Sequence, residues 1–180
     1  MPMKYILSFI CFALFSTSSF AFDCNFVAGK SLCGVPLSAA KPKYIDALGE
    51  PDGIIEMGKG RQGLVYGQRM LLMFNDQHLW EIHAWTYNSN FEFWGYIRNH
   101  ETRHEMKLLI GGESLWGKTR KNAQPLLAKF ATLAGDQFSE IRETHDGSIF
   151  VFYQPTLEVD TAPNDWNSYQ TNHVKISMHR

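Results

Sequence analysis

One short motif in this 180-residue chain has the residue types and spacing of a metal site. His100-Glu101-Thr102-Arg103-His104 matches the pattern H-E-x-x-H, in which two imidazoles bind Zn²⁺ and the Glu acts as general base. Both imidazoles face one ion only on a helix, yet the apolar residues on either side alternate with the period of a strand. We therefore interpret residues 99–103 as a hairpin tip and keep His100 and His104 as weak metal candidates. Three further side chains are third-ligand candidates without a fixed spacing: Glu113, His145 and His173.

A second motif has the spacing of a phosphate loop. Residues 112–119 read Gly-Glu-Ser-Leu-Trp-Gly-Lys-Thr and satisfy G-x-x-x-x-G-K-[ST]. The flanking pattern does not predict a parallel βαβ sheet, and the corresponding place in the first half of the chain reads Gly34-Val35-Pro36. We interpret these glycines as turn residues before a helix. No G-x-S-x-G nucleophile elbow occurs in the sequence, so the residues do not favour an enzyme, and no cofactor is expected.

Aromatic residues favour binding over catalysis. Six of them fall within the twelve residues 85–96, and a strand or loop in a small domain cannot bury both alternating faces. Exposed aromatic side chains dominate protein interfaces. The acidic and amide-rich segment 160–172 is a second predicted contact region, and stacking on the sugars of a glycan is the alternative. The predicted partner-binding residues are Trp85, Tyr87, Phe93, Trp94, Tyr96, Trp166 and Tyr169.

The composition excludes several classes of protein. Lys and Arg number 17 against 18 Asp and Glu, a net charge of −1, so binding to nucleic acid through counterion release is not expected. The content of 44% hydrophobic and 14% aromatic residues excludes a disordered chain. The length suits one domain or two small ones with a real core.

Residues 1–21 have the pattern of an export signal. Lys4 precedes an apolar run over residues 5–15, and Ser19-Phe20-Ala21 ends in the small residues of a signal-peptidase site. The run is too short to cross a bilayer, which needs about 20 residues, and no later segment is longer and as apolar. We predict cleavage after Ala21 and a soluble periplasmic product. An uncleaved anchor or a buried N-terminal helix is the alternative.

Two cysteines remain after this cleavage, Cys24 and Cys33. A pair of cysteines in an exported chain predicts a disulfide. Free thiols and a metal-binding pair are the alternatives, although two thiolates without a nearby His make a poor zinc site.

The chain also contains an internal repeat at an offset of 83 residues. Gly29-Lys30-Ser31-Leu32-Cys33-Gly34 recurs as Gly112-Glu113-Ser114-Leu115-Trp116-Gly117. Each copy leads into apolar residues at helical spacing, and these patterns end at Gly49 and Gly135. Three short strands are predicted after each helix, over residues 63–67, 69–74 and 79–85 and over residues 138–143, 149–153 and 174–178.

These patterns predict an α+β fold of two tandem repeats, each with a helix on an antiparallel three-stranded sheet. The first repeat spans residues 22–87, a linking hairpin spans residues 88–111, and the second repeat spans residues 112–180. Neither unit could bury much apolar surface alone, so the two should pack together or pair their sheets.

Residues 44–52, Tyr-Ile-Asp-Ala-Leu-Gly-Glu-Pro-Asp, are followed by strand patterns with Val65-Tyr66 and Leu72-Met73-Phe74-Asn75-Asp76. This arrangement resembles the small BamE/SmpA type of envelope domain. Two such units in tandem, with a Cys pair near the first helix, resemble the architecture of β-lactamase inhibitory proteins. The resemblance implies an α+β fold and a role in binding other proteins.

We therefore expect a soluble periplasmic protein-binding module, such as an inhibitor or an immunity protein that blocks a partner enzyme or toxin. The alternatives are an envelope-assembly scaffold of BamE type and a zinc-dependent hydrolase that uses the H-E-x-x-H motif.

Overall fold

Strands dominate the part of the chain that the structure describes. The computed structural model describes residues 20–85, 102, 104–154 and 166–179. The first half contains β1 (Phe20–Val27), β2 (Ser31–Leu32), β3 (Val35–Pro36), α1 (Lys41–Leu48), β4 (Gly53–Gly58), β5 (Arg61–Tyr66), β6 (Met70–Asn75) and β7 (His78–Trp85). The second half contains β8 (His104–Ile110), β9 (Glu113–Ser114), α3 (Arg120–Leu127), β10 (Ala131–Gly135), β11 (Ser139–Thr144), β12 (Gly147–Gln154), the 3₁₀ helix η1 (Trp166–Ser168) and β13 (Gln170–Met178).

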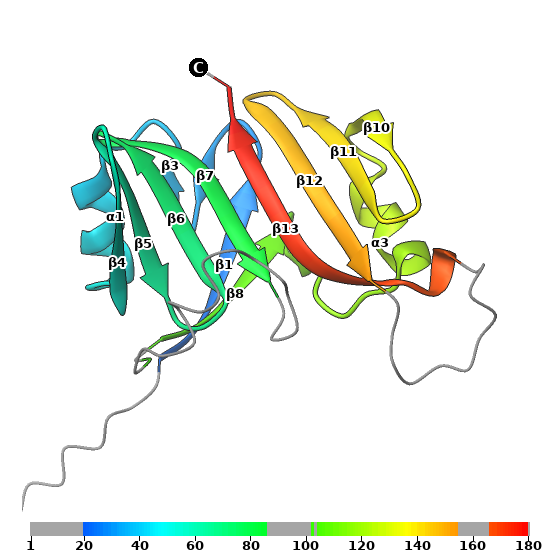
Figure 1. The fold of residues 1–180 in the computed structure, drawn as a ribbon, viewed down its shortest axis with the longest axis horizontal. Coiled ribbons are helices and arrows are strands. Elements are labelled where there is room, and N and C mark those ends of the chain that lie inside the picture. The colour runs from blue at the N-terminus through cyan, green and yellow to red at the C-terminus, as the bar shows by residue number, and fades with distance from the viewer. Residues whose placement is uncertain (1–19, 86–101, 103, 155–165, 180) are drawn as a thin grey trace, which may run out of the picture.

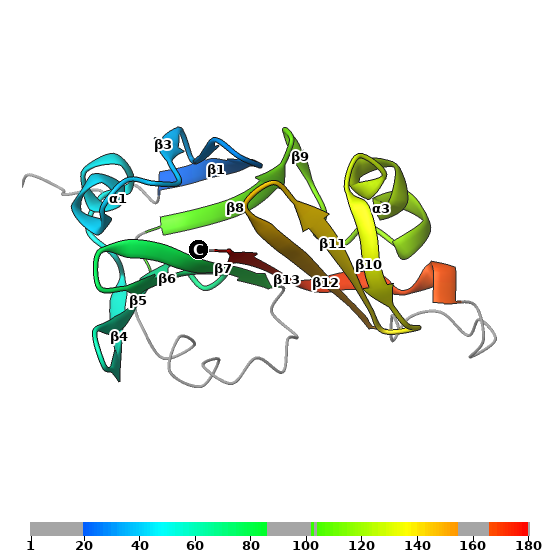
Figure 2. The same cartoon turned by 90° about the horizontal axis from the view of Figure 1, so that it is seen from above.

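Two sheets form two layers (Figures 1 and 2). The larger sheet has eight strands in the order β10-β11-β12-β13-β7-β6-β5-β4, and the smaller has five in the order β3-β2-β1-β8-β9. The smaller sheet and both α-helices lie on the same side of the larger sheet (Figure 2). The main apolar core lies between the layers, because strands of both sheets and both helices direct buried side chains into it.

The prediction of an α+β fold of two tandem repeats, each with a helix on a three-stranded sheet, is therefore wrong. Each half contributes a short helix and a four-stranded antiparallel meander, and the last strands, β7 and β13, pair antiparallel to make one continuous sheet. Strand β4 was missed because it follows Pro51 and Asp52, which are typical of a loop. Strand β10 was missed because its apolar residues extend the helical spacing of α3.

The second helix is shorter than its apolar pattern. Helix α3 ends at Leu127 instead of continuing to Gly135, because residues 131–135 pair with β11 as strand β10. Pro125 lies inside α3, where it has no N–H to donate to the preceding turn. Thr119 caps this helix and accepts a hydrogen bond from the Asn122 N–H. The first helix ends at Gly49 as predicted, with a φ of 85° that favours glycine.

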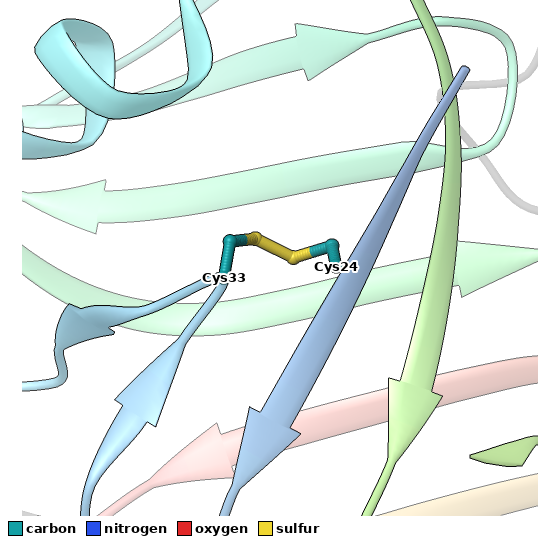
Figure 3. The surroundings of a disulfide bond; sticks show 2 residues. All are labelled: Cys24 and Cys33. Atoms are coloured by element: carbon teal, nitrogen blue, oxygen red, sulfur yellow. A yellow bond between two sulfur atoms is a disulfide. The ribbon is translucent and has the colours of Figure 1, made fainter. Parts of the chain in front are cut away.

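The predicted disulfide between Cys24 and Cys33 is confirmed (Figure 3). Cys24 lies on β1 and is fully buried in the main core, and Cys33 lies in the turn between β2 and β3. The bond therefore fixes the small hairpin at the edge of the five-stranded sheet to the strand beside it.

Strand β8 is the part of the predicted linking hairpin that falls within the described residues. It pairs in parallel with β1 along its whole length and with β9 at its end. The other arm of the predicted hairpin lies outside the described residues. None of the helices in the described ranges is both long enough and apolar enough to cross a membrane.

Candidate protein-binding face

The larger sheet has a face that the described helices and the smaller sheet do not cover (Figure 2). Because successive side chains on a strand alternate between faces, β12 directs Ile149, Val151 and Tyr153 into the core. Phe150 and Phe152 point the opposite way and are half-buried. We call this side of the sheet the outer face.

Histidines from both halves of the chain meet on the outer face. His83 of β7 and His173 of β13 lie on the paired strands at the centre of the sheet, with 3.2 Å between His83 Nδ1 and His173 Nε2. Their rings are inclined by 21° and their centroids are 5.4 Å apart. The distance between the two ring centroids exceeds the distance between the two nitrogens by about two ring radii. The two nitrogens therefore point at each other, as a hydrogen bond requires. His173 also stacks on Phe152, with ring centroids 5.1 Å apart.

A carboxylate and an amine extend this pair. Glu81 Oε2 lies 3.0 Å from His83 Nε2, and Glu81 Oε1 lies 3.3 Å from Lys175 Nζ. Lys175 in turn lies over the ring of Phe150, 4.6 Å from its centroid. Because a carboxylate accepts, His83 carries its proton on Nε2 when neutral, and its Nδ1 then accepts from His173 Nε2.

The environment of this network sets the charges of two members. Burial lowers the pKa of His173 to about 3, with help from the nearby His83 and Lys175, so His173 is neutral near pH 7. Burial alone would raise the pKa of Glu81, but the hydrogen bond from His83 and the charges of His83 and Lys175 outweigh it and lower that pKa below its usual value. A neutral His173 and an ionised Glu81 thus lie on either side of His83.

Towards β4 the outer face becomes apolar. A second, smaller cluster of buried side chains lies there: Val65, Leu71, Met73 and Trp85, with Ile55, Met57 and Trp80 packed against it. Trp80 is partly exposed, and the Arg61 guanidinium lies over its ring at 4.9 Å from the centroid. The outer face therefore offers a fixed set of charges and, towards β4, the partly exposed apolar side chains of Ile55, Met57 and Trp80.

Two predicted partner-binding residues are buried instead of exposed. Trp85 is fully buried in the smaller cluster, and Tyr169 is 8% exposed with its ring against Phe138. Trp166 begins η1. Tyr87, Phe93, Trp94 and Tyr96 lie outside the described residues, as does His100.

His104 does not lie on a helix, which the zinc motif requires. It begins strand β8, and its Nδ1 lies 3.0 Å from Oδ2 of Asp52, whose side chain is fully buried. Asp52 Oδ2 also accepts a hydrogen bond of 2.6 Å from the Gly67 N–H. Across the described ranges, no three His, Cys, Asp or Glu side chains gather closely enough to hold a metal ion.

The phosphate-loop motif is a turn, a short strand and a helix cap. Gly111 and Gly112, both with positive φ, make the turn from β8 into β9. A phosphate loop runs directly from a strand into a helix, whereas here β9 pairs back onto β8 before α3 begins. Lys118 Nζ pairs with Glu113, 3.6 Å away, inside the motif itself.

Sequence reasoning did not identify the network of Glu81, His83, His173 and Lys175. The period-two pattern of residues 170–178 would have placed His173 and Lys175 on one face of a strand, opposite Val174 and Ile176. No local signal shows that this strand pairs with β7, 90 residues earlier in the chain at the two histidines.

Comparisons with known proteins do not extend this description. No family model, no curated protein and no solved structure matches the chain. The geometry of the outer face is therefore the basis on which a function can be proposed.

Proposed function

We propose that this chain is an exported protein-binding protein that blocks a partner enzyme or toxin, as an inhibitor or an immunity protein does, by docking the outer face of its eight-stranded sheet. One observation carries the proposal. Partly exposed aromatic and charged side chains from β7, β12 and β13 gather on that face, whereas the described helices lie on the other. Aromatic side chains flanked by charges are typical of the residues that dominate interface energies.

The network on this face suits binding because it is ordered before a partner arrives. Glu81 holds both His83 and Lys175, and Lys175 lies against Phe150. Side chains that are already fixed lose less conformational entropy on association, so more of the contact energy appears as affinity. A pre-ordered face that blocks a partner needs no catalytic group.

Export supports the same proposal. The pattern of residues 1–21 predicts a cleaved signal, and the Cys24–Cys33 disulfide is the kind of bond that persists in an oxidising compartment such as the periplasm. Secreted toxins and envelope enzymes are partners that a periplasmic protein can reach.

The experiment compares capture by matched variants. Tagged protein purified from the periplasm is incubated with envelope extract, and the retained proteins are quantified by mass spectrometry. Phe150→Ala removes an aromatic ring from the outer face, and Ile54→Ala removes an exposed apolar side chain on the first strand of the same sheet. We expect a stoichiometric partner whose retention falls about tenfold with Phe150→Ala and is unchanged with Ile54→Ala.

Equal retention by the two variants, or no stoichiometric partner, would contradict the proposal. If the captured partner belongs to the outer-membrane assembly machinery, the scaffold role replaces that of an inhibitor. An inhibitor or immunity protein should instead abolish the activity of the captured enzyme or toxin when the two are mixed in equal amounts.

A further inference from the structure

Residues of helix α3 and of the hairpin β10–β11 line a polar groove. These elements lie at the end of the larger sheet that β10 forms (Figure 1). Its cavity volume is about 560 Å³, and charged and amide side chains supply most of its wall. The chemically informative ones are Arg120, Gln124, Asp136, Glu140 and Arg142. The groove is remote from the outer-face histidines, since β12 separates β11 from β13.

The two carboxylates of the groove already have donors. Glu140 accepts from the Tyr153 hydroxyl, from Gln124 Nε2 at 3.0 Å and from Arg142 Nη2 at 2.7 Å. Burial opposes ionisation of Glu140, but these hydrogen bonds and the Arg142 charge outweigh it and lower its pKa. Asp136 Oδ1 accepts from the Phe138 and Ser139 N–H groups at 2.8 and 2.7 Å. Neither carboxylate therefore needs a cation from outside.

The two guanidiniums, by contrast, keep unused donors. Arg142 donates a hydrogen bond from Nη1 to Thr132 Oγ1 at 2.5 Å and two from Nη2, to Gln124 and Glu140. Its Nε is buried and has no hydrogen-bond partner in the described chain. Arg120 donates hydrogen bonds from Nη1 only, to the carbonyls of residues 136 and 137 at 2.7 and 3.3 Å. Its guanidinium lies over the Tyr153 ring. A buried donor without an acceptor is costly, so the groove is chemically incomplete.

We propose that this groove binds a carboxylate of a second protein: an Asp or Glu side chain carried on an extended segment that runs beside β10. The buried Nε–H of Arg142 lacks an acceptor, the half-buried Arg120 has N–H groups to spare, and a carboxylate matches the planar, charge-assisted geometry of a guanidinium best. A divalent cation would meet carboxylates that are already engaged and donors that repel it.

The setting of β10 favours an extended segment as the carrier. Strand β10 is the last strand of the eight, every residue in it is exposed, and its one strand neighbour in the described sheet is β11. Leu133 of β10 and Phe138, just after that strand, are 53% and 46% exposed and give this edge of the sheet apolar surface. An extended chain can add to such an edge while an alternate side chain enters the groove. This site does not depend on the outer face being a docking surface.

The test is a titration of ¹⁵N-labelled full-length mature protein, followed by NMR. The probe is a blocked peptide, Val-Thr-Glu-Thr-Val, and the control is the same peptide with Gln in place of Glu. We expect the Glu peptide to shift the Nε–H signals of Arg120 and Arg142 and the β10 amides, and to bind about tenfold more tightly than the Gln peptide. Sodium acetate should shift the two arginine signals only.

Matched variants locate the effect. Arg120→Gln should weaken binding of the Glu peptide about tenfold, whereas Lys121→Gln, the same charge change at an exposed neighbour outside the groove, should weaken it less than about twofold. Arg142 is left intact, because its loss would strand the buried Glu140 charge. Phe150→Ala should leave peptide binding unchanged, which separates this site from the proposed docking face.

Three results would overturn the proposal: equal affinities for the Glu and Gln peptides, equal losses in the two charge variants, or no arginine shifts at millimolar peptide. Arginine shifts with acetate but none at β10 with either peptide would refute the extended segment as the carrier.

Discussion

The pH dependence of stability should depend on His173. Burial holds its pKa at about 3 in the folded protein, against an ordinary value of 6.5 for an unfolded chain. When folding lowers the pKa of a group, that group stabilises the folded state at pH values above its pKa in the unfolded chain. The contribution is lost as the pH falls, because the unfolded chain then binds a proton that the folded chain does not. The protein should therefore lose stability below pH 6.5.

The magnitude follows from the two pKa values. At about 1.4 kcal/mol for each pKa unit, lowering the pH from 7.5 to 5 should reduce the free energy of unfolding by about 2 kcal/mol through His173. Glu81 and Glu140 have pKa values below their usual 4.5, so their contributions are lost only at lower pH. The interval from pH 6.5 to 5 thus separates the histidine from these carboxylates.

The assay is urea unfolding followed by circular dichroism at pH 7.5, 6.5, 5.5 and 5. His173→Gln removes the titration but keeps an amide N–H that can reach the Nδ1 of His83. This variant should lose less than half as much stability as the unmodified chain between pH 7.5 and 5, whereas His78→Gln, at an exposed histidine, should behave as the unmodified chain does. Equal pH slopes for His173→Gln and the unmodified chain would refute the assignment.

Three further perturbations test the packing around this framework. Replacing Cys24 and Cys33 together by Ser should lower the free energy of unfolding by about 2–3 kcal/mol, measured by urea unfolding, because the loop between them is no longer closed. Asp52→Asn should lower the free energy of unfolding by about 1–3 kcal/mol, since a neutral amide oxygen accepts the Gly67 and His104 N–H groups more weakly than the buried carboxylate does, while the exposed Asp46→Asn should change it by less than about 0.5 kcal/mol. Gly147→Ala should lower the free energy of unfolding by about 1–3 kcal/mol or prevent folding, because the added Cβ would lie 1.8 Å from the Ser177 carbonyl oxygen. A thermal melt that matches that of the unmodified chain would contradict this close approach.

The sequence predicts local features of this chain better than its assembly. The disulfide and the end of α1 at Gly49 follow from one or two residues each, and both are present. Strands β5, β6 and β7 lie close to their predicted ranges, because their β-forming runs are bounded by turn residues. Sheet membership was missed, since it depends on pairing between segments far apart in the chain.

The same limit applies to the candidate site. Sequence reasoning looked for aromatic clusters, and it found Trp85, which the sheet buries. The period-two pattern places Glu81 and His83 on one face of a strand, but nothing near His83 in the sequence indicates that His173 lies beside it. Only the antiparallel pairing of β7 with β13, which sets Lys175 opposite His83 and His173 opposite Trp85, turns these scattered residues into one network.

Because of this pairing, the proposed docking face needs residues from both halves of the chain. Strand β7 supplies Glu81 and His83, and strand β13 supplies His173 and Lys175, so either half alone would hold half of the network. Separation of the two strands would take Lys175 from Glu81 and His173 from His83, and would leave only the contact between Glu81 and His83 within β7. Binding by the outer face should therefore require the joined sheet, and any condition that weakens the β7–β13 pairing should weaken binding before the core on the other side unfolds.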